Sequence, residues 1–164
     1  MTEERRLYPS TRKLLDAPDD ARIRQIKSDH FIPHQRVQKL LEEINDLINH
    51  PPTHRMPNRL ILGETNNGKS MVVLRFLKEY PPELNEDGKA IKVPVLYILM
   101  PAIPRERAFY LNILETLGAK YREYASTADL GILALKILRK VDLKLMIIDE
   151  IHNILGGDTK QRKE

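Results

Sequence analysis

The stretch Gly63-Glu-Thr-Asn-Asn-Gly68-Lys69-Ser70 decides the fold that this sequence predicts. It fits the pattern G-x-x-x-x-G-K-[ST], in which two glycines let the backbone wrap closely around a phosphate group. The apolar run before it, 59–62, predicts a short buried strand, and the segment Ser70 to Tyr80 after it has the apolar content and length of a helix. Strand, glycine-rich loop and helix in this order predict a phosphate-binding loop at a helix N-terminus.

Each part of this loop has a chemical task. The backbone N–H groups point inward at the phosphates, and the helix N-terminus adds the positive end of its dipole. We expect the Lys69 ammonium to bridge β- and γ-phosphate oxygens and the Ser70 hydroxyl to bind Mg²⁺. The residues expected to bind the nucleotide are Gly63, Glu64, Thr65, Asn66, Asn67, Gly68, Lys69, Ser70 and Met71.

A second motif ends another apolar strand. The run Leu145-Met-Ile-Ile-Asp149-Glu150 places two adjacent carboxylates at the C-terminal end of this strand, where ligands bind in open α/β sheets. Adjacent residues on a strand point to opposite sides, so the two carboxylates can take different tasks. Asp149 is the natural partner of Mg²⁺, and Glu150 is placed to polarise the water that attacks the γ-phosphate. Nucleotide binding follows from the two motifs together, whereas hydrolysis is a separate question.

The remaining chain alternates between helical and strand patterns. Predicted helices cover about 35–49, 70–80, 104–117 and 128–140, and predicted strands cover 59–62, 94–100 and 143–148. Ser126, Thr127 and Asp129 supply a cap and a dipole partner for the last helix. This alternation predicts an α/β layer fold with a largely parallel sheet. The strand at 94–100 is apolar without alternation, as expected where both faces are covered.

Composition limits the other possibilities. The 164 residues hold 27 Lys and Arg against 23 Asp and Glu and no Cys, which excludes disulfides and a Cys nucleophile. The N-terminus lacks the apolar segment of a secretory signal. The longest uncharged stretch, Val93 to Pro104, is far shorter than the ~20 residues of a spanning helix, so we expect a cytoplasmic protein. Residues 1–30, interrupted by Pro9 and Pro18, predict an N-terminal extension to a domain at 31–164.

The two motifs together carry a family resemblance. Gly63–Ser70 and Leu145–Leu155 (LMIIDEIHNIL) resemble the Walker A and Walker B motifs of the AAA+ ATPases that regulate bacterial transposition, the TniB/TnsC kind. The segments Phe31-Ile-Pro-His34 and Arg55-Met-Pro-Asn58 resemble TniB proteins in order and spacing. The resemblance covers about residues 22–164, and the extension of the Walker B motif is its most specific part.

The resemblance implies a P-loop NTPase of AAA+ type, a three-layer αβα sandwich that binds ATP and Mg²⁺. It also implies a homo-oligomer, often a helical filament on DNA, that recruits or activates a DDE transposase at a target site. Carried over by position, the Walker A residues hold nucleotide and metal, Asp149 helps to hold Mg²⁺, and Glu150 is the hydrolytic base. His152 and Asn153 match the family string, with a structural or a sensing role equally open. Ile32 and Pro33 are candidates for the adenine pocket.

The sequence also departs from the family. In the AAA+ sheet the strand order is 5-1-4-3-2, and this chain ends 14 residues after Glu150. We therefore expect a C-terminally truncated domain without strands 4 and 5, the arginine finger and the helical lid. Impaired hydrolysis and exposed apolar strand edges are the expected consequences.

Two other functions stay open at this point. The string Asp149-Glu-Ile-His152 fits the DExH box of helicases, although those enzymes need a second domain that 164 residues cannot hold. The other alternative is a non-catalytic fragment that binds nucleotide, DNA or a partner protein. Its phosphate contacts would come from basic residues near the two ends, namely Arg5, Arg6, Arg12, Lys13, Lys160, Arg162 and Lys163.

Overall fold

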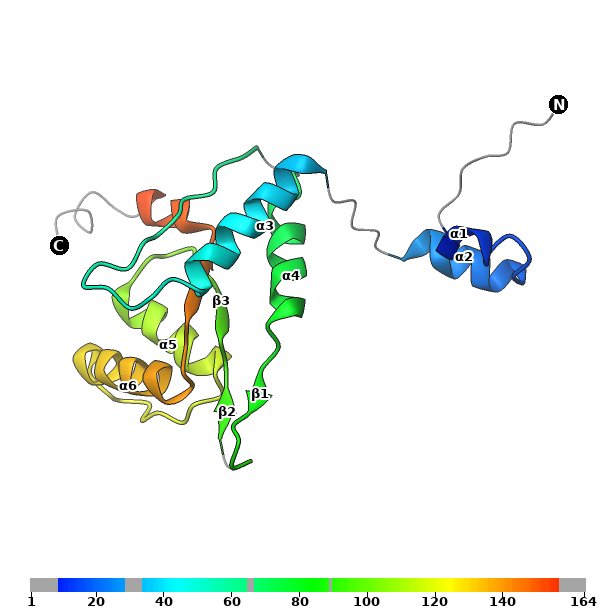
Figure 1. Cartoon of the computed structure of the whole chain (residues 1–164). Coiled ribbons are helices and arrows are strands. Elements are labelled where there is room, and N and C mark those ends of the chain that lie inside the picture. The colour runs from blue at the N-terminus through cyan, green and yellow to red at the C-terminus, as the bar shows by residue number, and fades with distance from the viewer. Residues whose placement is uncertain (1–8, 29–33, 65–66, 89, 157–164) are drawn as a thin grey trace. The chain divides into compact units, whose positions relative to one another are not determined.

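The computed structural model describes residues 9–28, 34–64, 67–88 and 90–156 (Figure 1). The chain divides into two compact units, Met1–Pro33 and His34–Glu164. The smaller unit contains α1 (Pro9–Arg12) and α2 (Asp19–Lys27), and α2 buries none of its side chains. Pro18 caps the start of α2, as expected of a residue that cannot continue a preceding helix.

The larger unit is built on a two-stranded parallel sheet of β3 (Val95–Leu99) and β4 (Leu145–Asp149). The register pairs Val95 with Leu145 and Leu99 with Asp149. The two apolar runs predicted as strands at 94–100 and 143–148 are thus confirmed as strands, and the predicted parallel sheet is confirmed with two strands, of which β4 is half-buried. The protein is a mixed α/β structure with a small parallel sheet.

Two pairs of helices cover the two faces of this sheet (Figure 1). On one face lie α3 (Gln35–Ile48) and α4 (Lys69–Glu79), and on the other lie α5 (Glu106–Thr116) and α6 (Thr127–Lys140). All four helices match the predicted segments. The Ser126 hydroxyl accepts a hydrogen bond from the Asp129 N–H at 3.1 Å and so caps α6, as predicted.

Alternate residues of each strand enter different apolar clusters. Val95 packs with α3 and α4, whereas Leu96 and Ile98 pack with α5 and α6. In β4, Leu145 and Ile147 join the first cluster and Met146 joins the second. Odd-numbered residues of both strands therefore face α3 and α4, which explains why neither strand shows an alternation of apolar and polar residues.

The predicted buried strand at 59–62 is wrong. These residues form no strand, and the side chains of Leu60 and Leu62 are 65% and 83% exposed. Only Ile61 packs against the cluster formed with α3 and α4. The physical reason is that a strand needs a partner: β4 pairs with β3, and no strand within the described ranges pairs with 59–62.

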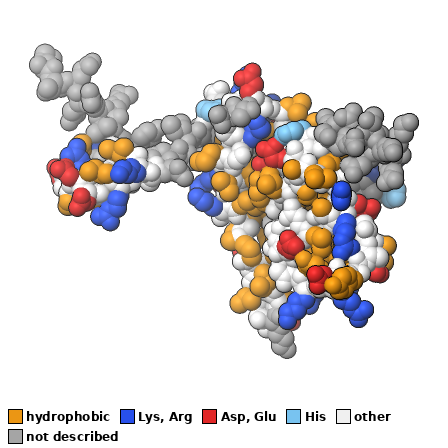
Figure 2. All heavy atoms as spheres, turned by 180° about the vertical axis from the view of Figure 1, so that it is seen from behind, with side chains coloured by type: hydrophobic (Ala, Val, Ile, Leu, Met, Phe, Trp, Pro, Cys, Tyr) orange, Lys and Arg blue, Asp and Glu red, His pale blue; other side chains and the backbone are white. Residues whose placement is uncertain are grey.

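Figure 2 shows apolar side chains among charged ones on one face of the larger unit.

The structure also contains a small hairpin that the sequence pattern did not predict. The strands β1 (Glu83–Leu84) and β2 (Ile91–Lys92) pair antiparallel on either side of a turn that contains Asn85 and Gly88. The Asn85 side chain accepts a hydrogen bond from the Ala90 N–H at 3.1 Å, and Gly88 adopts a left-handed φ of 66°. Strands of two residues are too short to leave a periodic pattern.

Among the described helices, none is long and apolar enough to cross a membrane.

Candidate functional site

The N-terminus of α4 is left without a side-chain cap among the described residues. Gly68 is its N-cap residue, with a left-handed φ of 74° that favours glycine, and its carbonyl accepts the first helical bond from the Val72 N–H at 3.1 Å. The backbone N–H groups of Lys69, Ser70 and Met71 precede that first bond and have no helical partner. This helix end can therefore donate hydrogen bonds to an anion.

The Lys69 side chain folds back over the loop that precedes it. Its Nζ donates hydrogen bonds to the carbonyl oxygens of Gly63 and Glu64, both at 2.8 Å. A Cβ at Gly63 would lie 3.6 Å from Lys69 Cδ, so the lysine stem covers this glycine in ordinary contact. An ammonium has three N–H donors, and two of them are used here. The Lys69 charge is thus held at the mouth of the loop.

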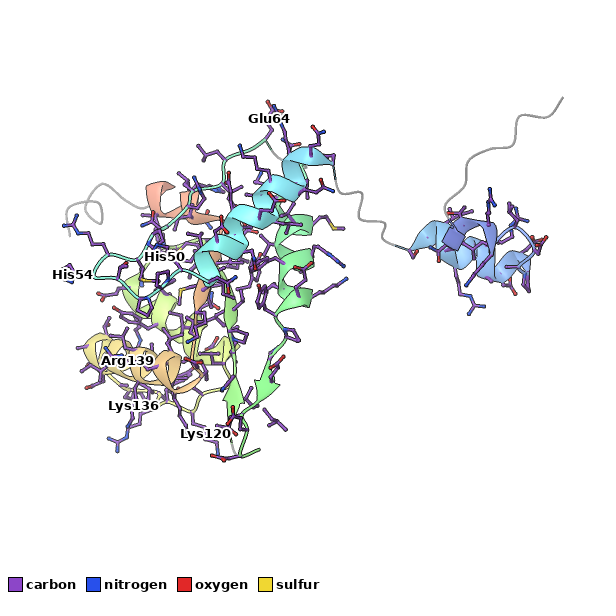
Figure 3. The ribbon with its side chains drawn as sticks, in the orientation of Figure 1. His50, His54, Glu64, Lys120, Lys136 and Arg139 are labelled. Carbon is purple, nitrogen blue, oxygen red and sulfur yellow. The ribbon has the colours of Figure 1, made fainter. Side chains whose placement is uncertain are left out.

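The other predicted loop residues are open to solvent. Gly63, Glu64, Asn67, Gly68 and Ser70 are exposed, and the side chain of Met71 is 39% exposed. Figure 3 shows Glu64 at the outer edge of the larger unit. Thr65 and Asn66 lie outside the described residues.

The Asp149 carboxylate is held by two donors at the end of β4. The Tyr97 hydroxyl donates to Oδ2 at 2.9 Å, and the Glu150 backbone N–H donates to Oδ1 at 2.8 Å. Asp149 is an odd-numbered residue of β4, so it lies on the face that α3 and α4 cover. Burial, followed by the hydrogen bond to Asp149, raises the pKa of Tyr97 to about 12. Tyr97 therefore keeps its proton and acts as a donor at neutral pH.

Glu150 has different surroundings from Asp149. It follows the strand with a left-handed φ of 55°, which is rare for a residue with a side chain. Its Oε2 lies 3.3 Å from Nδ1 of His152, and the two side chains are 48% and 71% exposed. The two adjacent carboxylates thus contact different partners, in line with the different tasks expected of them. The role of Glu150 as a base stays a prediction.

Asn153 ties the segment after β4 to the end of β3. This residue belongs to the 3₁₀ helix Ile151–Gly156, and its side-chain amide donates to the Met100 carbonyl at 3.1 Å. Its backbone N–H donates to the Glu150 carbonyl at 2.9 Å. These contacts fix the backbone that follows Asp149, and the sensing role that the sequence left open for Asn153 stays a prediction.

The loop and the acidic pair lie at the same end of the sheet. Figure 1 shows the start of α4 and the 3₁₀ helix after β4 at the upper end of β3 and β4. Val72 and Phe76 of α4 belong to the apolar cluster that Leu145 and Ile147 of β4 join. No hydrogen bond or ion pair within the described ranges joins the loop 63–70 to Asp149 or Glu150. The two motifs therefore lie at the same end of the sheet.

Some predicted contacts cannot be placed. Ile32, Pro33 and the basic residues near both ends lie outside the described residues, except for Arg12 and Lys13, which are exposed in the smaller unit. The described residues hold no cluster of three or more His, Asp or Glu that could bind a metal ion. Sequence reasoning missed Tyr97. Its signal was a single phenol in an apolar strand, since a Tyr hydroxyl in such surroundings usually finds a partner.

Comparison with known families identifies the chain. The family model described as Bacterial TniB protein matches residues 22–164. The match spans most of the sequence, including the loop 63–70, both strands of the parallel sheet and the acidic pair. The chain therefore belongs to the bacterial TniB family. No curated protein matches the sequence.

Proposed function

We propose that this TniB-family chain binds ATP with Mg²⁺ at the sheet end where the loop Gly63–Ser70 and Asp149 lie. The observation that supports the proposal best is the N-terminus of α4, which has no side-chain cap and follows a loop of the phosphate-binding pattern. A helix end of this kind offers both free N–H donors and a positive dipole end. The side chain with a full positive charge, Lys69, lies at the same place.

We assign the nucleotide contacts to Gly63, Gly68, Lys69 and Ser70. On binding, the Lys69 ammonium would exchange the carbonyls of Gly63 and Glu64 for phosphate oxygens, which are stronger acceptors because they are charged. The loop N–H groups would donate to the same phosphates. The exposed position of the loop leaves room for this exchange without moving a buried side chain.

Ser70 and Asp149 offer the ligand atoms that Mg²⁺ prefers, a hydroxyl oxygen and a carboxylate oxygen. Proteins usually bind Mg²⁺ through one or two such groups together with phosphates and waters. Asp149 fits this role because each of its oxygens has one fixed donor and keeps further acceptor capacity. A bound Mg²⁺ would neutralise charge on the phosphates.

We propose Glu150 as the base that activates water for hydrolysis. Its side chain is half exposed, and its carboxylate faces His152 rather than the Tyr97–Asp149 pair. A carboxylate that is open to solvent can accept a proton from a nearby water molecule. Glu150→Gln keeps the shape of the side chain and removes the basic oxygen. We therefore expect it to leave ATP binding intact and to lower only the rate of hydrolysis.

The wider role follows from the family. We propose that residues 31–164 belong to an AAA+ ATPase domain, that residues 1–30 form an extension to it, and that the chain acts in transposition. Target DNA, a DDE transposase and further copies of the chain are the proposed partners. Support for these partners comes from the TniB membership alone.

The central experiment measures ATP affinity in the presence of Mg²⁺ by isothermal titration calorimetry. Lys69→Ala removes a charged donor whose hydrogen bonds are worth about 1.5–3 kcal/mol, so we expect affinity to fall roughly 10- to 100-fold. Lys78→Ala is the matched control, since Lys78 lies exposed in the last turn of the same helix, and its affinity should stay within about twofold of wild type. Unchanged affinity in Lys69→Ala would refute the proposal.

A further inference from the structure

We propose that Tyr97 is a positioning residue for the Asp149 carboxylate, through which β3 orients the group that takes Mg²⁺. The proposal rests on the proposed function, in which Asp149 helps to hold the metal ion. Tyr97 belongs to neither sequence motif and lies 52 residues before Asp149 in the chain. Its role is therefore assigned by the fold and by no local pattern.

Two hydrogen bonds determine the orientation of this carboxylate. The Tyr97 hydroxyl contacts Oδ2 and the Glu150 N–H contacts Oδ1, at 2.9 and 2.8 Å. The backbone bond is formed by the chain next to Asp149 itself, whereas the hydroxyl bond comes from a different strand. With one donor on each oxygen, rotation about the Cβ–Cγ bond breaks both bonds. Each oxygen still has a lone pair for a metal ion or a metal-bound water.

The strand register explains how Tyr97 reaches this position. Tyr97 pairs with Ile147 and Leu99 pairs with Asp149, so the hydroxyl crosses to a residue two places further along β4. Both residues are odd-numbered and lie on the same face, where the long Tyr97 side chain spans the diagonal to Asp149. Leu99, the residue of β3 paired with Asp149, is aliphatic and offers no hydrogen-bond donor on its side chain, so Tyr97 is the side chain of β3 that holds the carboxylate.

The hydroxyl also has the charge that this role needs. A phenol hydroxyl is a neutral donor, so Tyr97 can hold the carboxylate without placing a second positive charge beside the proposed metal ion. Groups that orient metal ligands by hydrogen bonding typically change metal affinity about 10- to 100-fold when they are replaced. Loss of this hydroxyl should therefore weaken Mg²⁺ binding and leave the phosphate contacts of the loop unchanged.

The test separates metal binding from nucleotide binding in Tyr97→Phe, which keeps the ring and removes the hydroxyl. ATP affinity is measured first in EDTA, and Mg²⁺ is then titrated at saturating ATP. We expect the EDTA affinity to stay within about twofold of wild type and the half-saturating Mg²⁺ concentration to rise roughly 10- to 100-fold. Tyr110→Phe is the matched control, since its hydroxyl donates to the Glu106 carboxylate at 2.8 Å on α5. It should change neither value.

A second variant shows whether Tyr97 acts through Asp149. In an Asp149→Asn background, Tyr97→Phe should have no further effect on the Mg²⁺ requirement. An unchanged Mg²⁺ requirement in Tyr97→Phe overturns the inference, and so does an equal loss of affinity in EDTA, which would make the hydroxyl a structural group. A Tyr97→Phe chain without wild-type circular dichroism counts against it for the same reason. If wild type fails to bind ATP in a Lys69-dependent way, the proposed function fails instead.

Discussion

Replacing Leu62 with alanine tests whether the segment before the phosphate-binding loop is exposed. A fully buried Leu→Ala change costs about 2–5 kcal/mol of the free energy of unfolding, through lost transfer energy and the cavity left behind. The Leu62 side chain is 83% exposed, so about a sixth of its surface is protected from water. Scaling the cost by that fraction gives roughly 0.5 kcal/mol, and no cavity forms at an exposed site.

Leu114→Ala is the matched control because it makes the same chemical change at a site that is 0% exposed, within α5. It should cost the full 2–5 kcal/mol. Both variants are unfolded in urea and followed by far-ultraviolet circular dichroism, and their midpoints are compared at equal slope. The expected result is a clear shift for Leu114→Ala and almost none for Leu62→Ala.

The opposite result would refute the reasoning. If Leu62→Ala lost as much stability as Leu114→Ala, residues 59–62 would be a buried strand, as their apolar sequence predicts. Leu60→Ala is a second test of the same exposure, because the Leu60 side chain is 65% exposed and lies two residues before Leu62. A cost above about 2 kcal/mol at either position would contradict the observed exposure.

Two further predictions concern packing and protonation. A Cβ at Gly131 would lie 3.0 Å from two ring carbons of Tyr110. Alanine gains ~1 kcal/mol of helix propensity over glycine, but we expect the overpacking against the ring to outweigh it. Gly131→Ala should therefore lower the free energy of unfolding, measured in urea, by up to about 2 kcal/mol. In a Tyr110→Leu background it should stabilise. The raised pKa of Tyr97 predicts a tyrosine ionisation near pH 12 in a Mg²⁺-free titration at 295 nm. This step should be lost in Tyr97→Phe, whereas the ionisations of Tyr110 and Tyr121, whose pKa values are also raised by hydrogen bonds to Glu106 and Glu115, should remain. Since the folded pKa of Tyr97 exceeds the ordinary 10.0, its contribution to stability is complete below pH 10 and lost as pH rises through 12.

The helices could be predicted because their signals are local. In α3, apolar residues recur every three or four positions, and this spacing alone fixes which side faces the sheet. In α6, the Ser126 cap and its partner Asp129 lie three residues apart, so the local sequence is enough to predict where the helix begins. Neither signal depends on the rest of the fold, and the structure confirms both helices within one or two residues.

Only two of the three predicted strands form, because the apolar sequence of a segment does not show which other segment it will pair with. The runs at 94–100 and 143–148 pair with each other and form β3 and β4. The run at 59–62 has the same apolar character but pairs with no strand within the described ranges, and two of its leucines face water. Strand formation needs hydrogen bonds to another segment, whereas hydrophobicity records only a preference for burial.

The candidate site likewise has one part that is local in sequence and one part that depends on strand pairing. The loop Gly63–Ser70 is contiguous in sequence, so its pattern identified it without knowledge of the fold. The contact between Tyr97 and Asp149 depends on the register of two strands and could not be found in this way. A slip of one residue between β3 and β4 would move Tyr97 to the opposite face from Asp149 and break the bond. The orientation of the proposed metal ligand and the register of the sheet are therefore coupled, so substitutions that disturb strand pairing should affect Mg²⁺ binding even when they lie far from the phosphate-binding loop.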